Sequence, residues 1–241
     1  MARHADRGVG MADNILFLRL EGPLQAWGER ARWSIRDTAS EPTKSGVVGL
    51  LACALGWSVD EDLRNLSRSI KIGIRCDRAG IMLRDYHTVT GGVLSAEGKV
   101  KINANTKEPE TVVSERYYLA DASFLVAVQA EPEWINRLGS GLQDPVWPFF
   151  LGRKSCPPAT PVFSGSGSFP SLETALQAIP VQIKQPDGSN EIYLRVVLEC
   201  KPTGENATRR RDEVDSRASR TFHPRYVCEK LLSIPVQTEV T

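Results

Sequence analysis

Apolar positions near the start of the chain change from strand spacing to helix spacing. Residues 15–18 form a short apolar run that ends before a Gly-Pro pair, which favours a buried strand followed by a turn. Residues 47–55 then carry apolar side chains at helical spacing, with Thr43 or Ser45 available as the N-cap and Gly56 just past the end. We therefore expect a strand, an exposed loop of polar and aromatic residues, and a helix.

The same pattern predicts the elements of the middle of the chain. Helices are expected over 60–66 and 132–138, and strands over 70–76, 83–89 and 124–128. Residues 90–115 are rich in Gly, Ser, Lys, Asn and Thr and lack a core-forming period, which predicts a long hairpin projecting from the body. This order of elements fits a split βαβ arrangement of the ferredoxin or RNA-recognition type, although composition does not separate it from other α+β folds.

A second block of strands is expected in the last third of the chain. Residues 164–168 are typical of a flexible Gly-Ser linker, and Ser171 is placed to cap a short helix over 172–178. Strands are expected over 192–200 and 225–234, with a polar, charged segment over 201–219 between them.

Charge and cysteine content narrow the class of protein. The chain carries 30 Lys and Arg against 29 Asp and Glu, so nucleic-acid binding would depend on local basic patches. Its five cysteines include no Cys-x-x-Cys pair, and the chain has only three histidines. Both observations argue for reduced cytosolic thiols and against a zinc site. No apolar run approaches the roughly 20 residues that cross a bilayer. We expect a cytoplasmic protein without membrane contact, metal or cofactor.

Catalytic motifs are absent from the sequence. It contains no nucleophile elbow, no HExxH helix and no dinucleotide fingerprint, and Lys44-Ser45 lacks the upstream glycines of a P-loop. His87 could act as a general base, and on an alternating strand Asp85 shares its face while Tyr86 points away. We favour a structural or substrate-positioning role for His87 and expect no catalytic residue; a surface position is favoured for His223.

Two short segments could bind phosphate without hydrolysing it. The helix start around Lys44 offers free N–H groups, hydroxyls and a cation, with simple capping and a solvated lysine as the alternative. In residues 152–155, Arg153 and Lys154 follow Gly152 and precede two prolines, which predicts a rigid basic edge. Trp27, considered alone, is more often a packing residue than a base-stacking platform. Residues 209–211 are three arginines that neighbouring acids neutralise, as in a solvated loop.

Five motifs in one order resemble the CasD family, the fifth-family CRISPR-associated, RAMP-type subunit of the type I-E Cascade complex. They are Gly-Pro-Leu-Gln-Ala-Trp-Gly at 22–28, Pro-Thr-Lys-Ser-Gly-Val-Val-Gly-Leu-Leu at 42–51, Leu-Arg-Asp-Tyr-His-Thr-Val at 83–89, Arg-Tyr-Tyr-Leu-Ala-Asp-Ala-Ser-Phe at 116–124 and Leu-Gly-Arg-Lys-Ser-Cys-Pro at 151–157. A weaker sixth motif is Arg220-x-Phe222-x-x-Arg225-Tyr226. The resemblance covers about residues 14–227 and thins over 89–114 and 165–211.

The resemblance implies an α+β protein in two parts. Residues 1–10 are polar and Met11 falls just before the first strand, so a disordered extension is expected before these parts. Residues 11–164 would form a ferredoxin-like, RNA-recognition-like domain with a long thumb hairpin at about 89–116, and residues 165–241 a smaller β-rich C-terminal region.

The resemblance also implies a function. Such a subunit binds the 5′ handle of the CRISPR RNA, caps one end of the complex, contacts the Cascade backbone and large subunits, and supports recognition of target DNA in antiviral defence. The type I-E branch leaves RNA cleavage to another protein. The alternative is a metal-independent endoribonuclease that processes repeat RNA, as in the type I-C branch, using His87 or Tyr86. A structural module that binds no nucleic acid is a third possibility.

The residues expected at the RNA handle combine hydrogen-bonding, stacking and cationic side chains. They are Gln25, Trp27, Lys44, Ser45, Arg84, Tyr86, His87, Arg153, Lys154 and Ser155. Lys99, Lys101 and Lys107 on the thumb are expected to contact RNA or neighbouring subunits.

Overall fold

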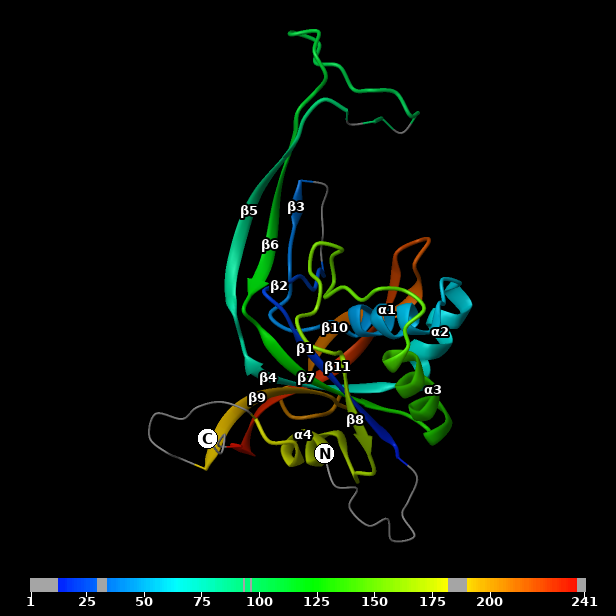
Figure 1. The fold of residues 1–241 in the computed structure, drawn as a ribbon, viewed down its shortest axis with the longest axis vertical. Coiled ribbons are helices and arrows are strands. Elements are labelled where there is room, and N and C mark those ends of the chain that lie inside the picture. The colour runs from blue at the N-terminus through cyan, green and yellow to red at the C-terminus, as the bar shows by residue number, and fades with distance from the viewer. Residues whose placement is uncertain (1–12, 30–33, 93, 96, 182–189, 238–241) are drawn as a thin grey trace.

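The fold is built on a seven-stranded antiparallel sheet with the order β10-β11-β9-β4-β7-β1-β8 (Figure 1). The computed structural model describes residues 13–29, 34–92, 94–95, 97–181 and 190–237, so the extension expected at 1–10 lies outside the described residues. The strands are β1 (Ile15–Glu21), β4 (Lys71–Arg78), β7 (Ser123–Gln129), β8 (Phe163–Gly167), β9 (Glu191–Glu199), β10 (Thr208–Ser216) and β11 (Thr221–Pro235).

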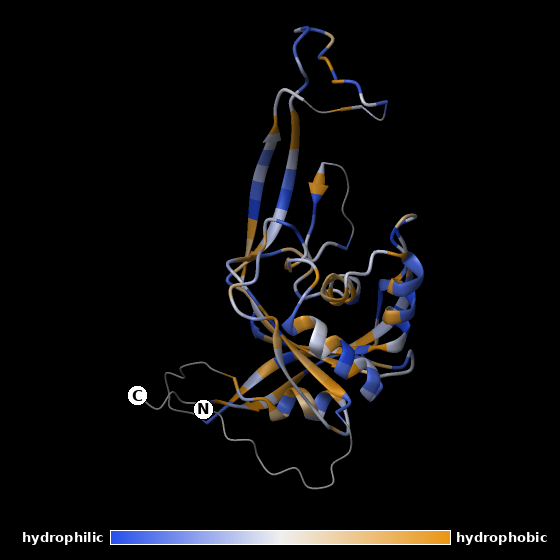
Figure 2. Ribbon diagram, turned by 45° about the vertical axis from the view of Figure 1, so that its right-hand side comes forward, coloured by the Kyte–Doolittle hydropathy of each residue, from blue (hydrophilic) through white to orange (hydrophobic). Residues whose placement is uncertain are grey.

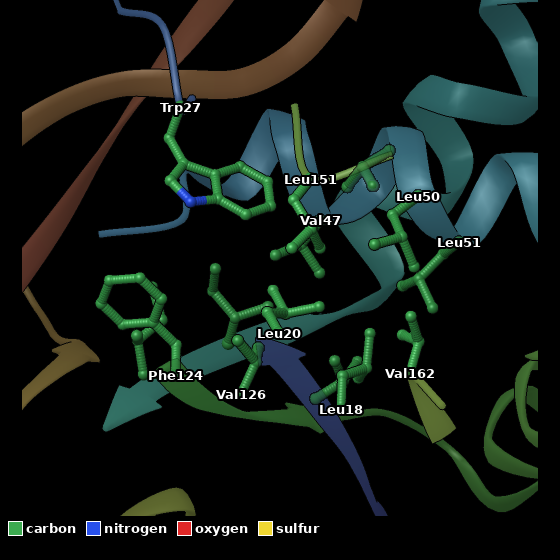
Figure 3. Packing of buried hydrophobic residues seen from close by; sticks show 14 of the residues in the cluster. Leu18, Leu20, Trp27, Val47, Leu50, Leu51, Phe124, Val126, Leu151 and Val162 are labelled. Carbon is green, nitrogen blue, oxygen red and sulfur yellow. The ribbon is translucent and has the colours of Figure 1, made fainter. Parts of the chain in front are cut away.

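Helices cover both faces of this sheet. α1 (Lys44–Leu55), α2 (Asp60–Ser69) and α3 (Pro132–Gln143) belong to one hydrophobic cluster, and α4 (Leu172–Ala178) belongs to a second. In β1, Leu16 and Leu18 face the first cluster while Ile15 and Phe17 face the second, as the two-residue period of a strand requires. Figure 3 shows Leu18 of this first cluster across from the side chains of α1. The central strands are therefore buried on both faces.

β4 differs from the half-buried strand that its alternation predicts. Gly73 and Arg75 are buried because α4 lies over the face that was expected to meet solvent. The Arg75 guanidinium pairs with Asp77 at 2.6 Å and donates to the carbonyl oxygens of Leu176, at 2.6 Å, and Ile179. A buried cation is tolerated here because its N–H groups find acceptors.

Two segments expected to be irregular are strands. The predicted linker over 164–168 is wrong, because β8 pairs with β1, with Gly167 opposite Ile15. The polar segment over 201–219 contains β10, which pairs with β11 along the sheet edge. Ladder hydrogen bonds join backbone groups, so Gly, Ser and charged residues can form strands that hydrophobic patterning does not reveal. β9 pairs with β4, and the sheet thus continues past residue 165.

The expectation of five reduced thiols is wrong for two cysteines. Cys200 and Cys228 form a disulfide with a Cα–Cα distance of 5.9 Å. The antiparallel β9–β11 ladder places Cys228 opposite Leu198, which brings it close to Cys200 although the two are 28 residues apart. Burial raises the pKa of the thiols of Cys53, Cys76 and Cys156, which keeps them protonated and weakly nucleophilic.

A long hairpin projects from the body, and its arms are β5 (Ile81–Val89) and β6 (Val112–Ala120) (Figure 1). The opposite edge of β6 pairs with two short strands, β2 (Leu24–Gln25) and β3 (Ile35–Arg36). Figure 2 shows apolar and polar segments following one another along the arms. Within the described ranges, no helix is long and apolar enough to cross a membrane.

Candidate nucleic-acid interface

The hairpin exposes three of the residues that the sequence predicts at the site. Arg84 and Tyr86 lie on one face of β5, where the Tyr86 residue is 63% exposed and the Arg84 side chain is 60% exposed. The Arg84 Nη1 atom lies 3.7 Å from Glu115 Oε1 on β6, a loose pair that leaves the guanidinium accessible. On the other face, His87 Nδ1 lies 3.6 Å from Asp85 Oδ2, which confirms that these two side chains share a face.

The hairpin surface is both apolar and cationic. At the tip, Lys99, Lys101 and Lys107 are exposed. Isolated β-bridges, such as the one between Leu94 and Val100, connect backbone segments of the tip. Large apolar residues along the arms and tip are exposed as well: Ile81, Met82, Leu83, Val89, Leu94, Val100, Ile102 and Val113. Exposed apolar residues gathered on one element mark a surface that meets a partner.

Gln25 and Trp27 do not lie in an exposed loop. Gln25 is 0% exposed and Trp27 is 1% exposed. The Gln25 amide donates to the carbonyl oxygens of Leu20, at 3.0 Å, and Ala122, at 2.8 Å, and its oxygen accepts a 3.0 Å hydrogen bond from Trp27 Nε1. The indole lies over the cluster formed by β1, β7 and α1 (Figure 3). The expectation of an exposed edge here is wrong, because the buried polar groups satisfy one another.

Lys44 is also buried, at 2% exposure, whereas Ser45 is partly exposed. The Lys44 ammonium lies 3.2 Å from Glu199 and 3.3 Å from Glu213. The Thr43 hydroxyl caps α1 by accepting from Gly46 N, and the Lys44 N–H donates to Asp212 Oδ2 at 2.7 Å. A carboxylate of the chain itself therefore occupies the helix start where phosphate was expected.

Asp212 is the centre of an ion-pair cluster that the sequence did not reveal. The Arg225 guanidinium donates two hydrogen bonds, of 2.7 and 2.8 Å, to the Asp212 carboxylate. Burial alone would raise the pKa of Asp212, but the hydrogen bonds and charge of Arg225, with the Lys44 N–H, hold that pKa below its usual value. Residues 209–211, expected in a solvated loop, are part of β10, and Arg210 pairs with Glu29 and Glu41 at 3.0 Å.

The 152–155 loop divides into a partly buried anchor, Arg153, and an exposed edge. Arg153 donates to the carbonyl oxygens of Tyr117, Arg36 and Asp37, and its guanidinium lies 4.7 Å from the centroid of the Tyr118 ring. Lys154 and Ser155 are exposed. Arg153 thus fastens the loop to β6 beside the base of the hairpin, so the prediction of a free phosphate contact fits Lys154 better.

Arg36 and Arg116 are site candidates that the sequence reasoning missed. Arg36 of β3 is the register partner of Arg116 of β6, which in turn is the register partner of Asp85 of β5. The register therefore places two partly exposed arginines side by side on adjacent strands, opposite Asp85. The sequence could not predict that these two arginines are neighbours, because they lie far apart in the chain and β3, which pairs Arg36 with Arg116, is only two residues long.

The fold and the site define a mixed α/β protein that presents a long apolar and cationic hairpin for interaction. The chain belongs to the family described as CRISPR-associated protein (Cas_Cas5), whose model matches residues 15–228. It is 39% identical over 164 residues to the CRISPR system Cascade subunit CasD of Escherichia coli (strain K12), covering 63% of this chain and 70% of that protein. The CasD-family resemblance in the sequence is confirmed.

Two solved structures have the same fold. One is titled "CRISPR RNA-guided surveillance complex"; it matches with a TM-score of 0.77 and 27% identity, over 92% of this chain and 91% of that chain. The other is titled "Crystal structure of Cas protein"; it matches with a TM-score of 0.68 and 32% identity, over 92% of this chain and 98% of that one.

Proposed function

We propose that this protein is a non-catalytic, cytoplasmic subunit of a type I-E CRISPR Cascade surveillance complex. In this proposal it binds the 5′ handle of the CRISPR RNA, caps one end of the complex beside the backbone and large subunits, and supports recognition of target DNA. The likeness to CasD, which is named a Cascade subunit, and to a chain of an RNA-guided surveillance complex supports it.

The strand order supports a ferredoxin-like layout for the domain proposed at residues 11–164. β1, β4, β7 and β8 are neighbours in the order β4-β7-β1-β8, with α1 and α2 before β4 and α3 before β8. This is the spatial order of a split βαβ unit in which the hairpin is inserted between β4 and β7. The smaller C-terminal region at 165–241 then extends the sheet through β9.

The observation that carries the RNA proposal is the exposed β5 arm of the hairpin, whose base lies close to the 152–155 loop. Tyr86 offers a stacking surface beside Arg84 on one face of β5, while His87 on the other face and Lys154 on the loop add donors and charge, which are what single-stranded RNA requires. Arg153 and the buried Gln25, Trp27 and Lys44 contribute by holding the hairpin base and the adjoining core in place. Ser155 on the loop, Ser45 on α1 and the tip lysines are proposed to contact RNA or a neighbouring subunit.

The test measures binding of a fluorescent handle RNA to the purified full chain by anisotropy over a salt series. Arg84→Ala with Lys154→Ala should weaken binding at least about tenfold and lower the salt slope by roughly one for each phosphate that the variant no longer binds. Arg209→Ala with Tyr193→Ala is a matched control on the exposed surface of β9 and β10, and it should bind as the wild type does. Equal affinities for both double variants would contradict the proposal.

The paired side chains of Asp85 and His87 keep endoribonuclease activity as the second candidate function. Incubating the chain with its repeat RNA in EDTA distinguishes the two. The non-catalytic proposal expects intact RNA, whereas specific cleavage that His87→Ala abolishes would overturn it.

A further inference from the structure

We propose that a pocket between α1, α2 and the β10–β11 hairpin docks a segment of a partner protein that presents a large apolar side chain beside a carboxylate. The cavity has a volume of about 270 Å³. Its walls include Val48, Leu63, Val214 and Phe222, and its rim carries Arg217 and Arg220. The inference rests on the proposed function for one point, that the partner is another subunit of the same complex.

The size and shape of the cavity suit a protein side chain. A volume of about 270 Å³ lies below the roughly 300–1,000 Å³ of most small-molecule sites, so the pocket is small for a cofactor. Gly49 opens it from the α1 side, since a Cβ built there would meet no atom within 4 Å. Val48, Leu63 and Val214 are buried in the protein core and give the pocket fixed apolar walls.

The rim lacks the carboxylates that its two arginines could bind. Arg217 and Arg220 are exposed, and neither guanidinium makes a hydrogen bond or ion pair with the part of the chain that the structure describes. The nearest acids are already engaged. Asp60 accepts from Ser216 and from the backbone N–H of Arg217, and Asp215 pairs with Arg64 and His223. An incoming carboxylate would therefore meet two cations that are not in a hydrogen-bonded ion pair, although the charge of Arg217 also acts on Asp60.

The pocket is ordered before any partner binds. Asp60, at the start of α2, holds the tip of the β10–β11 hairpin by accepting hydrogen bonds from the Ser216 hydroxyl and from the N–H groups of Arg217 and Ala218. The same hydroxyl bond lowers the pKa of Asp60, so its charge persists to acid pH. Because this side of the pocket is already fixed, a partner loses little affinity to ordering it.

A nucleotide fits this pocket less well than a protein segment. A base carries hydrogen-bonding groups on its edges, and aliphatic walls would leave most of them unpaired. The pocket also lies beside α1 and α2, to the right in Figure 1, whereas the β5–β6 hairpin rises at the left. Its partner would therefore contact the protein away from the hairpin.

The test fills the cavity without removing a charge. The tagged full chain is co-expressed with a CRISPR RNA and the other Cascade subunits, and the ratio of each copurified subunit is measured for the wild type, Gly49→Leu and Asn136→Leu. The leucine at position 49 should occupy the open space above α1 and lower the ratio of one protein subunit at least about tenfold. Asn136→Leu adds a leucine at an exposed position of α3 outside the pocket, and it should leave every ratio at the wild-type value.

A charge variant tests the rim independently. Arg217→Glu with Arg220→Glu should lose the same subunit as Gly49→Leu, while Arg209→Glu, an exposed charge reversal elsewhere on β10, should not. Handle RNA binding by the purified variants should match the wild type, and melting temperatures should show that they are folded. If both pocket variants kept wild-type subunit ratios, the pocket proposal would be wrong while the proposed function would stand. The same conclusion would follow if a pocket variant lost RNA binding but retained every subunit. Failure of the wild type to assemble or bind RNA would overturn the proposed function and the partner named here.

Discussion

Gly152 connects the exposed 152–155 loop to the protein core through its backbone conformation. Its φ is +88°, and a Cβ at this position would lie 1.7 Å from the carbonyl oxygen of Ala26. The Ala26 N–H donates to Leu151 O at 3.0 Å, so the two segments cannot separate without losing a buried hydrogen bond.

Gly152→Ala should therefore destabilise the protein severely. The substitution combines left-handed strain with a steric clash against backbone atoms, and we expect a loss of about 2 kcal/mol or more in the free energy of unfolding. Urea unfolding followed by circular dichroism would measure it. Gly49→Ala, in the interior of α1 with open space around it, is the control and should stabilise by about 0.5–1 kcal/mol. A neutral Gly152→Ala would show that the loop does not hold this conformation.

The Asp212 carboxylate should make stability depend on acid pH. Its pKa is lower in the folded protein than in the unfolded chain, so its contribution is present above the unfolded value of about 3.9 and is lost as pH falls through the folded value. Asp212→Asn should cost about 3 kcal/mol near neutral pH, because the buried Arg225 loses its closest carboxylate and keeps only the longer 3.7 Å pair with Glu199. The gap between wild type and variant should narrow below about pH 4. A gap that stays constant to pH 2 would contradict this account.

At the scale of elements, hydrophobic spacing predicted most of the buried structure. Strands β1 and β7 and helices α1 and α4 lie where their apolar runs and caps place them, since burial and capping are local properties that the sequence carries. β8 and β10 were missed because they are held by backbone pairing at the two edges of the sheet and by ion pairs of β10.

The candidate site was predicted in part for the same physical reason. Arg84 and Tyr86 are exposed because β5 projects from the body and none of its residues is buried. The burial of Trp27 and Lys44 depends on partners far along the chain, Asp212 and Glu199 among them. The spacing of residues around position 44 does not predict these partners. The sequence supplied these residues as candidates, while their positions in three dimensions required the fold.

The hairpin tip, residues 90–111, should be dispensable for folding. None of its described residues belongs to either hydrophobic cluster, and its backbone contacts are local turns and isolated bridges. Replacing residues 90–111 with a two-residue Asn-Gly turn should leave the melting temperature within about 2 °C of the wild type. Copurification with the other subunits should fall, because the tip lysines and apolar residues are removed. A large loss of thermal stability would show that the tip supports the body.

At the scale of the whole molecule, one sheet unites strands from both ends of the chain. β4 lies between β7 and β9, so residues before 80 and after 190 share a ladder. Both hydrophobic clusters contain residues from the C-terminal strands. The first includes Val214 and Val227, and the second includes Leu194 and Ile234 together with Ile15. A truncation after α4 would therefore expose apolar surface on β4 and β7 as well as deleting three strands.

This pairing also determines when the protein can fold during its synthesis. β11 lies between β10 and β9, and the ladder of Glu191–Glu199 against Thr221–Pro235 cannot form until the ribosome has made the second of these strands. Until then the edge of β9 that pairs with β11 is open to pairing with any nascent strand nearby. Contacts so distant in sequence form slowly, so we expect the emerging chain to aggregate more readily than a protein whose strands pair with their neighbours in sequence.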